Sequence, residues 1–203
     1  MVIGEWNRSV WMSYAGVAAS CIGIYFAAVE HNFPYAVICL IVAGLCDMLD
    51  GFVARTMKKR TATAKRFGIE LDSVADVMDF IALPVVIIAS MGVNIFETIP
   101  LIVFAVFGLE RLAHFNTTAA NADKPVKFYH GLPVTFTALI FPLCFLCFAL
   151  IVPSVLKEML LITVSIIGIL NVLDIHVYKP KPWTYGIFFV LAVAVTALLV
   201  VAL

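Results

Sequence analysis

The sequence predicts an all-α integral membrane protein, a bundle of about seven transmembrane helices. The first observation is composition: of the 203 residues, 64% are hydrophobic and 13% are charged, whereas soluble domains average roughly 45–50% apolar and about 25% charged residues. The mean hydropathy is +1.09. The second observation is that apolar stretches of spanning length, about 20 residues, cover most of the chain. We therefore expect residues 1–203 to form a single polytopic membrane domain.

Seven apolar stretches are long enough to cross a bilayer. In chain order, the predicted spans are 9–29, 34–56, 67–91, 95–115, 132–152, 157–174 and 183–203. The connection 57–66 is short. Because consecutive elements with a short connection usually pack side by side, the second and third spans are expected to be antiparallel neighbours.

The basic residues predict how these spans are oriented. If the spans alternate in direction, twelve of the thirteen Lys and Arg residues fall on one side, and only Lys157 falls on the other. The positive-inside rule then places the N-terminus and the loops after the second, fourth and sixth spans in the cytoplasm. We expect a multi-pass protein of the cytoplasmic membrane. The basic cluster 58–66 is expected to contact anionic lipid head groups.

Five aspartates lie inside the second and third spans, where charge is costly. Asp47 and Asp50 share one helical face, and Asp72, Asp76 and Asp79 share another at spacings i, i+4 and i+7. Because the two helices are expected to be antiparallel neighbours, the two acidic faces can meet near the cytoplasmic end. A salt-bridging or capping role opposite the basic cluster is the structural alternative.

So many carboxylates cannot all be ionised in one place without a counter-charge. Protonation is one solution, and it is typical of an ion- or proton-coupled transporter. Bound Mg²⁺ or Mn²⁺ is the other, since these cations take oxygen ligands and bridge to substrate phosphates. Gly51 and Gly68 lie one turn from the acids on both helices. They favour the second solution, because they leave room for a bulky ligand near the backbone.

In order, these residues read Asp47-x-x-Asp50-Gly51-x-x-Ala54-Arg55 and Gly68-x-x-x-Asp72-x-x-x-Asp76. The pattern, over residues 47–76, resembles the signature of the CDP-alcohol phosphotransferases, which are integral membrane enzymes. The resemblance implies the fold of that family, a six-helix core plus an extra span here. Twelve residues separate Arg55 from Gly68, whereas the commonest family spacing is eight. We expect the extra four to fall in the basic loop KKRTATAKR (58–66), outside the helices.

Further segments are similar to bacterial phosphatidylserine synthases. They are FGIELDSVADV (67–77), LPVV (83–86), RLAHFN (111–116) and GLPVTFTALIFPL (131–143). The resemblance implies a phospholipid-synthesising transferase that moves the phosphatidyl group of CDP-diacylglycerol to L-serine, releasing CMP. It also implies that the protein forms a homodimer. We expect no nucleic-acid partner. Transfer to inositol, glycerol phosphate or an amino alcohol, or an ion-coupled transporter, are the alternatives. Asp79 stands where such synthases usually carry a serine.

The resemblance also implies residue roles. Two divalent cations, Mg²⁺ or Mn²⁺, would be held by Asp47, Asp50, Asp72 and Asp76, and Asp76 would be the general base. The expected contacts of the CDP group are Asp50, Gly51, Ala54, Arg55, Gly68 and Asp72. The candidate contacts of the acceptor or a phosphate, in or near a cytoplasmic loop 110–131, are Arg111, Lys127, His130 and Asp79. Arg55 and Arg111 could instead be interface or topology-setting charges.

Overall fold

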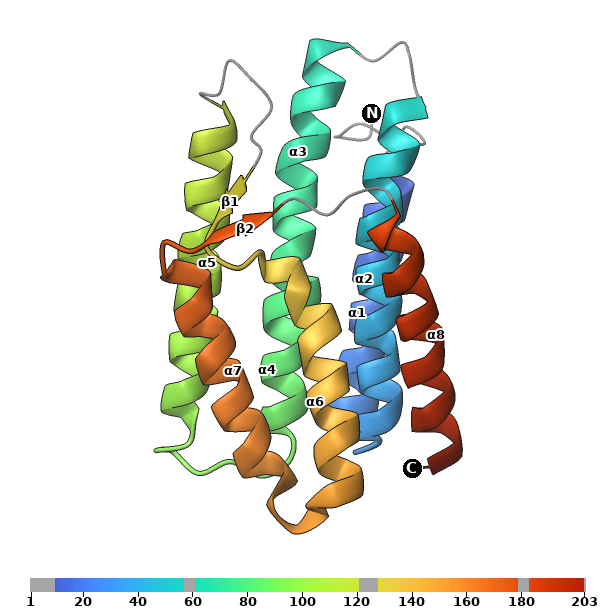
Figure 1. Ribbon diagram of the computed structural model, residues 1–203, viewed down its shortest axis with the longest axis vertical. Coiled ribbons are helices and arrows are strands. Elements are labelled where there is room, and N and C mark those ends of the chain that lie inside the picture. Colours follow the sequence, from blue (N-terminus) through green and yellow to red (C-terminus); the bar gives the residue numbers. More distant parts are fainter. Residues whose placement is uncertain (1–9, 57–60, 121–127, 179–182, 203) are drawn as a thin grey trace.

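Seven helical rods run up and down side by side in the computed structural model (Figure 1). The structure describes residues 10–56, 61–120, 128–178 and 183–202, without the side chains of 51–56, 62, 65, 119 and 120. The rods are α1 (Trp11–Ala28), α2 (Phe33–Thr56), the continuous rod of α3 (Ala62–Asp76), η1 (Val77–Ala82) and α4 (Leu83–Ala89), then α5 (Thr98–Ala120), α6 (Thr137–Ile151), α7 (Leu156–Val172) and α8 (Thr184–Ala202). Short 3₁₀ turns, η2 (Val134–Phe136) and η3 (Pro153–Val155), precede α6 and α7.

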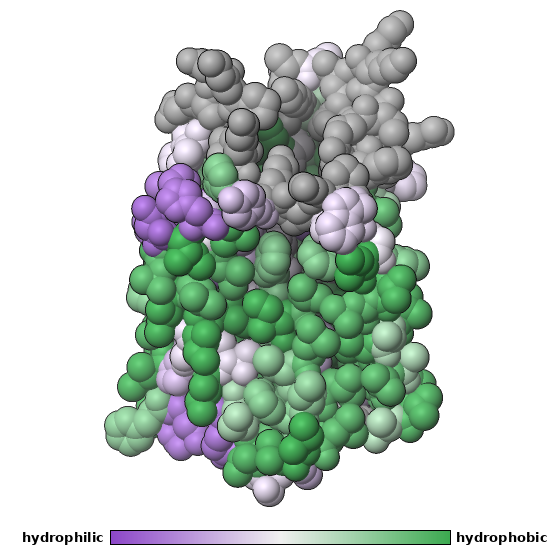
Figure 2. Space-filling model, viewed as in Figure 1, coloured by the Kyte–Doolittle hydropathy of each residue, from purple (hydrophilic) through white to green (hydrophobic). Residues whose placement is uncertain are grey.

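The fold confirms the predicted all-α membrane bundle. Six of the helices in the described ranges are long and apolar enough to cross a bilayer, and the rod from α3 to α4 is another apolar helix. Figure 2 shows a broad hydrophobic band around the middle, with polar residues gathered toward the two ends. The chain is therefore an integral membrane protein.

Two predicted boundaries are wrong. The third helix begins at Ala62 rather than at 67. Thr61 caps it, because its side chain accepts a hydrogen bond from the Ala64 backbone amide (3.1 Å). Residues 62–66 thus belong to a helix, not to a loop. The helix α5 continues to Ala120, so Arg111 is a helical residue and not part of a loop.

Small residues let α1 pack closely on its neighbours. Its buried residues recur every three or four positions and are all small: Ser13, Gly16, Ala19, Ser20, Gly23 and Ala27. A Cβ atom at Gly23 would lie 2.9 Å from the Cβ of Cys39 on α2 and from a methyl group of Leu83 on α4. Close backbone approach through small residues is how membrane helices commonly associate.

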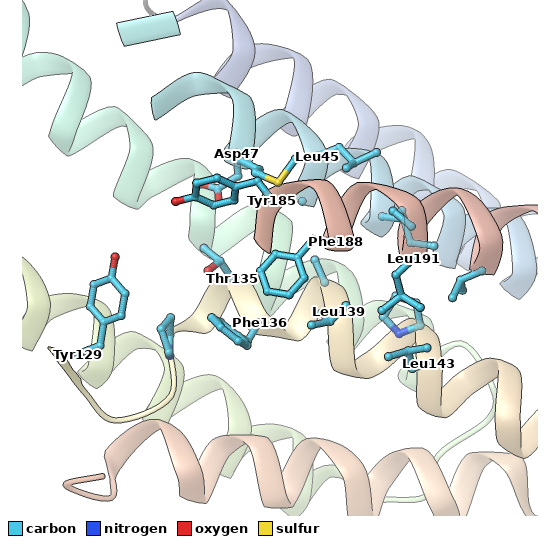
Figure 3. Close-up of a pocket in the computed structure, with 18 residues that line it drawn as sticks. Leu45, Asp47, Tyr129, Thr135, Phe136, Leu139, Leu143, Tyr185, Phe188 and Leu191 are labelled. Atoms are coloured by element: carbon cyan, nitrogen blue, oxygen red, sulfur yellow. The ribbon is translucent and has the colours of Figure 1, made fainter. Parts of the chain in front are cut away.

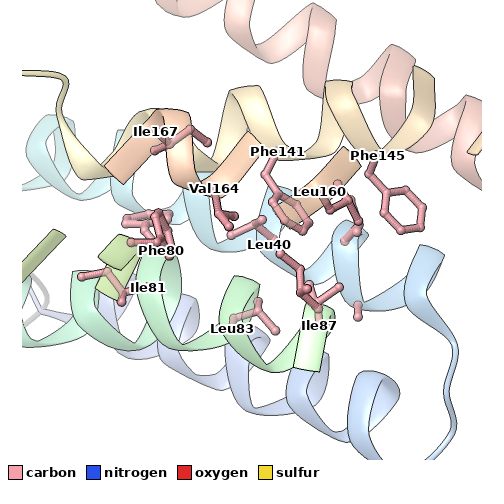
Figure 4. Packing of buried hydrophobic residues seen from close by; sticks show 14 of the residues in the cluster. Leu40, Phe80, Ile81, Leu83, Ile87, Phe141, Phe145, Leu160, Val164 and Ile167 are labelled. Carbon is pink, nitrogen blue, oxygen red and sulfur yellow. The ribbon is translucent and has the colours of Figure 1, made fainter. Parts of the chain in front are cut away.

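The core lies between the rod α3–α4 and the helices α2, α6 and α7 (Figure 4). Leu40, Phe80, Leu83, Phe141 and Leu160 are all fully buried in it. Phe80 lies in η1, where the helix widens to π geometry directly after Asp76. Single π turns inside α-helices occur frequently at functional sites, and this one follows two aspartates of the predicted motif.

A small two-stranded ribbon, which the sequence did not predict, crosses the upper half of the bundle in Figure 1. The strands β1 (Phe128–His130) and β2 (His176–Tyr178) pair antiparallel, with His130 opposite His176. Gly131 follows β1 with a positive φ of 75°, and a Cβ there would overlap the carbonyl oxygen of Asn171. Only glycine fits this turn, which ties the ribbon to the end of α7.

Candidate active site

The two predicted acidic faces meet between α2 and α3. Asp47 and Asp50 on α2 and Asp72 on α3 each offer a carboxylate oxygen, and these atoms all lie within 4.8 Å of one another. All three residues are half-buried. Within the described ranges, no Lys or Arg forms an ion pair with them. Such a cluster of hard oxygen donors fits a divalent cation such as Mg²⁺ or Mn²⁺.

Asp76 lies one turn beyond Asp72 and is the most buried of the four motif aspartates, with 8% of its surface exposed. Its carboxylate interacts electrostatically with Asp47, Asp72 and Asp50. The structure thus brings three of the predicted ligands into a tight group, with the fourth one turn further along α3 and in electrostatic contact with them.

The helix α1 contributes residues that sequence reasoning did not find. The hydroxyl of Ser13 donates a hydrogen bond to the Asp50 carboxylate (3.2 Å). Gly16 faces Asp79, since a Cβ atom at Gly16 would lie 2.7 Å from Asp79 Oδ2. Asp79 is itself buried (3% exposed), and its Oδ1 has no hydrogen-bond partner among the described residues. The recurrence of small residues along α1 is the signal that could have indicated this packed face.

Arg111 on α5 interacts electrostatically with Asp76. It is 6% exposed, and its guanidinium lies 5.0 Å from the ring centre of Phe115 and 5.8 Å from that of Tyr129. Its Nε has no hydrogen-bond partner in the described part of the chain. The two rings contact each other, with their centres 5.9 Å apart, and Arg111 lies against both. A buried guanidinium in this position has donor capacity available for an anionic group.

Arg111 also lines a cavity of about 490 Å³ at the end of α5 and α7. The polar residues in its wall include Glu110, His114, His130 and Asp174. Two of the predicted acceptor contacts, Arg111 and His130, therefore line one cavity. Asp79 does not line it, and Lys127 lies outside the described residues.

The remaining motif residues lie on the predicted helices. Gly51, Ala54 and Arg55 belong to the last two turns of α2, but their side chains lie outside the described part of the structure. Gly68 lies on α3, one turn before Asp72. Their predicted contacts with the CDP group therefore stay predictions.

An apolar groove of about 260 Å³ leads away from the aspartates between α2, α6 and α8. Figure 3 shows Asp47 and Tyr185 at one end and Leu139, Leu143 and Leu191 farther along. Gly44 on α2 lies beside Ala138 of α6 in this groove, where a Cβ at Gly44 would be 2.6 Å from the Ala138 Cβ. The acidic cluster thus adjoins this apolar groove through Asp47.

The family model described as CDP-alcohol phosphatidyltransferase matches residues 6–170, more than half of the chain. The chain belongs to the CDP-alcohol phosphatidyltransferase family. This confirms the resemblance of residues 47–76, and the match includes the acidic cluster, Arg111 and most of the groove. Proteins of this family are generally dependent on divalent cations, which agrees with the oxygen-rich donor set on α2 and α3.

Similar proteins bear the name CDP-diacylglycerol–serine O-phosphatidyltransferase. The chain is 37% identical to that of Helicobacter pylori over 125 residues, 60% of this chain and 50% of the relative. It is 38% identical to that of Saccharomyces cerevisiae over 104 residues, 48% of this chain and 36% of the relative. It is 33% identical to that of Methanocaldococcus jannaschii over 134 residues, 66% and 58% of the two chains. The chain thus spans between about a third and three fifths of the length of these relatives.

Proposed function

We propose that this member of the CDP-alcohol phosphatidyltransferase family is a CDP-diacylglycerol–serine O-phosphatidyltransferase. One observation carries the proposal: aspartates of the signature over residues 47–76 come together from α2 and α3. The names of the similar proteins support serine as the acceptor. The reaction would release CMP and form phosphatidylserine. Family membership favours this transferase over the ion-coupled transporter.

The acidic cluster explains how a pyrophosphate could bind beside carboxylates. Asp47, Asp50, Asp72 and Asp76 would hold two divalent cations, Mg²⁺ or Mn²⁺, which neutralise the pyrophosphate and stabilise the attacking and leaving oxygens. Arg55, on the last turns of α2, would place its guanidinium against the nucleotide phosphates. Gly51, Ala54 and Gly68 would leave room for cytidine and ribose.

Asp76 would accept the proton of the attacking hydroxyl. Its burial next to three other carboxylates and within electrostatic range of Arg111 supports this role. A general base must lie within hydrogen-bonding reach of the proton it removes. An acceptor bound between Arg111 and the cluster would bring its hydroxyl toward Asp76.

Arg111 would bind the carboxylate of L-serine. Its Nε, which has no hydrogen-bond partner among the described residues, its burial and the adjoining cavity support this assignment, because guanidinium groups bind carboxylates in a directional, charge-assisted way. His130 lines the same cavity, although its Nδ1 contacts Asp174. Asp79 and Lys127 stay candidate contacts from the sequence.

The groove between α2, α6 and α8 would hold an acyl chain of CDP-diacylglycerol. It begins at Asp47 and is lined mainly by apolar side chains such as Phe136, Leu139 and Leu143. The lipid would then stay in the bilayer while its pyrophosphate reaches the cluster.

The protein would lie in the cytoplasmic membrane with the site facing the cytoplasm. The distribution of Lys and Arg supports this orientation. Lys157, the exception, lies at the other end of the bundle and contacts both carboxylate oxygens of Glu97 at 3.0 Å. A homodimer is the assembly that the family resemblance implies, and cross-linking in the membrane would test it.

The direct test is an acceptor panel with CDP-diacylglycerol and purified protein. We expect CMP release that needs L-serine together with Mg²⁺ or Mn²⁺ and that a chelator abolishes. CMP release with only inositol, glycerol phosphate or an amino alcohol would overturn the serine assignment and leave the transferase. No CMP with any acceptor would overturn the proposed function as a whole.

A further inference from the structure

A second group of side chains that could hold a metal ion lies at the ribbon, on other elements than the acidic cluster. His130 of β1, His176 of β2 and Asp174 between α7 and β2 each offer one ligand atom, and these atoms all lie within 4.8 Å of one another. All three side chains are exposed. The donor set differs from the acidic cluster, because it contains two imidazoles and one carboxylate.

The ribbon fixes the relative positions of these three residues. His130 and His176 are direct cross-strand partners, and their ring centres lie 4.9 Å apart. Residues directly opposite in an antiparallel pair project side by side from one face. Asp174 precedes His176 by two positions, and its Oδ1 lies 2.6 Å from His130 Nδ1. The backbone between them is held by the hydrogen bond from the Gly131 amide to the Ile175 carbonyl (2.9 Å).

The charge state of Asp174 also suits a ligand. The hydrogen bond with His130 is the main cause that lowers the pKa of the Asp174 carboxyl, with smaller effects of the charges on His130, His176 and His114. The carboxylate is therefore ionised at neutral pH, the form in which a carboxyl group binds a metal ion.

We propose that His130, Asp174 and His176 form a site for a borderline divalent transition-metal ion, Zn²⁺ being the representative. Two imidazoles and a carboxylate are a common set of three protein ligands for Zn²⁺, with water as the fourth ligand. Hard cations such as Mg²⁺ prefer all-oxygen sites, so the two metal sites of this chain would differ in chemistry. Binding would replace the His130–Asp174 hydrogen bond by two coordinate bonds.

The bound ion would fasten the ribbon across its two strands. The ribbon joins the C-terminal end of α7 to β1, whose central residue Tyr129 lies against Arg111. A ligand that binds only the folded state raises its stability. The ion would thus stabilise one wall of the Arg111 cavity, to which His130 and Asp174 belong.

The test is Zn²⁺ binding to the full-length protein in detergent, with Mg²⁺ in excess, by equilibrium dialysis and X-ray absorption at the zinc edge. We expect wild type to bind one Zn²⁺ more than His176→Gln or Asp174→Asn, with imidazole scattering in the wild-type spectrum. His31→Gln is the matched control, because His31 is exposed in the turn between α1 and α2. It should bind as wild type does. Gel filtration and thermal unfolding without zinc establish that each variant is folded.

Two results would overturn the proposal. One is equal Zn²⁺ binding by wild type, His176→Gln and Asp174→Asn. The other is zinc bound without imidazole scattering, at a site lost in Asp47→Asn. Neither result bears on CMP release, so this proposal and the proposed function can fail separately.

Discussion

Gly16 on α1 faces Asp79 in the π-helical turn so closely that a Cβ atom would lie 2.7 Å from Asp79 Oδ2. Both residues are buried. An Oδ2 atom at this distance forces the side chain of Asp79 or the helix α1 to move when a methyl group is added. Because Ser13, one turn away on α1, donates a hydrogen bond to Asp50, a shift of α1 would also reach the acidic cluster.

We expect Gly16→Ala to lower the free energy of unfolding by up to about 2 kcal/mol. Overpacking costs about 1–3 kcal/mol, and the higher helix propensity of alanine returns about 1 kcal/mol. Thermal unfolding in detergent measures the change. The matched control is Gly186→Ala on α8, where no atom of the described residues lies within 4 Å of the added Cβ, and it should be neutral or slightly stabilising.

The same contact predicts coupling between the two positions. In the background Asp79→Ser, which removes Oδ2, Gly16→Ala should no longer destabilise the protein. An unchanged cost would show that Asp79 is not the group that Gly16 accommodates. The acceptor panel on Asp79→Ser would also show whether Asp79 influences the choice of alcohol.

Asp76→Asn is expected to reduce CMP release by about 10²–10⁴-fold, the range of a lost general base. The amide has nearly the same shape, so the fold should be retained. The control is Glu70→Gln, which removes an exposed carboxylate from the same helix and should leave the rate unchanged. A rate for Asp76→Asn within a few-fold of wild type, measured with saturating metal, would remove the base role.

Arg111→Lys should raise KM for L-serine by roughly 10- to 100-fold, since a hydrogen bond to a charged group contributes about 1.5–3 kcal/mol. Lysine keeps the charge but loses the planar fork. KM for CDP-diacylglycerol should stay near the wild-type value, which serves as the internal control. Equal increases in both constants would indicate that Arg111 supports the fold of the site rather than the acceptor.

Leu139→Trp should obstruct the groove that leads from Asp47 along α6. We expect kcat/KM to fall at least several-fold for a donor with long acyl chains and to change little for a donor with short chains. Ile162→Trp is the control, because Ile162 on α7 is 54% exposed and is not among the residues that line the groove. Equal loss with both donors would place the acyl chains elsewhere.

The bundle and the acidic cluster were predictable from local rules. Apolar length predicted the seven rods, and the i, i+3 and i, i+4 spacings placed Asp47, Asp50 and Asp72 on facing sides of two neighbouring helices. The role of α1 was not predictable in this way. Ser13 and Gly16 are ordinary small residues, and only the packing of α1 against α2 and η1 brings them to Asp50 and Asp79.

The ribbon was missed for a different reason. Its strands have three residues each, too few for an alternating pattern to be recognised, and they pair across more than 40 positions of the chain. Such non-local pairing leaves no periodic signal in the sequence. The helical extension to Ala120 was missed because the polar residues after Arg111 resemble a loop in composition, although none of them breaks a helix.

The far end of the bundle offers a pH-dependent contact. The Asn94 amide (2.8 Å) and Lys157 donate hydrogen bonds to the Glu97 carboxylate, and in that order they lower the pKa of Glu97. A carboxyl whose pKa is lowered in the folded state stabilises the fold above its unfolded pKa, near 4.3. That contribution is lost as the pH falls through the lower, folded pKa.

Glu97→Gln should therefore reduce the melting temperature near pH 7, and the difference from wild type should shrink below about pH 4. Glu158→Gln is the control. The nearest carboxylate oxygen of Glu158 lies 3.7 Å from Lys157 Nζ, farther than the 3.0 Å of Glu97, and its side chain is half-exposed. The control should therefore change the melting temperature less than Glu97→Gln does. A difference between wild type and Glu97→Gln that stays constant from neutral to acid pH would show that the charge of Glu97 does not stabilise this end.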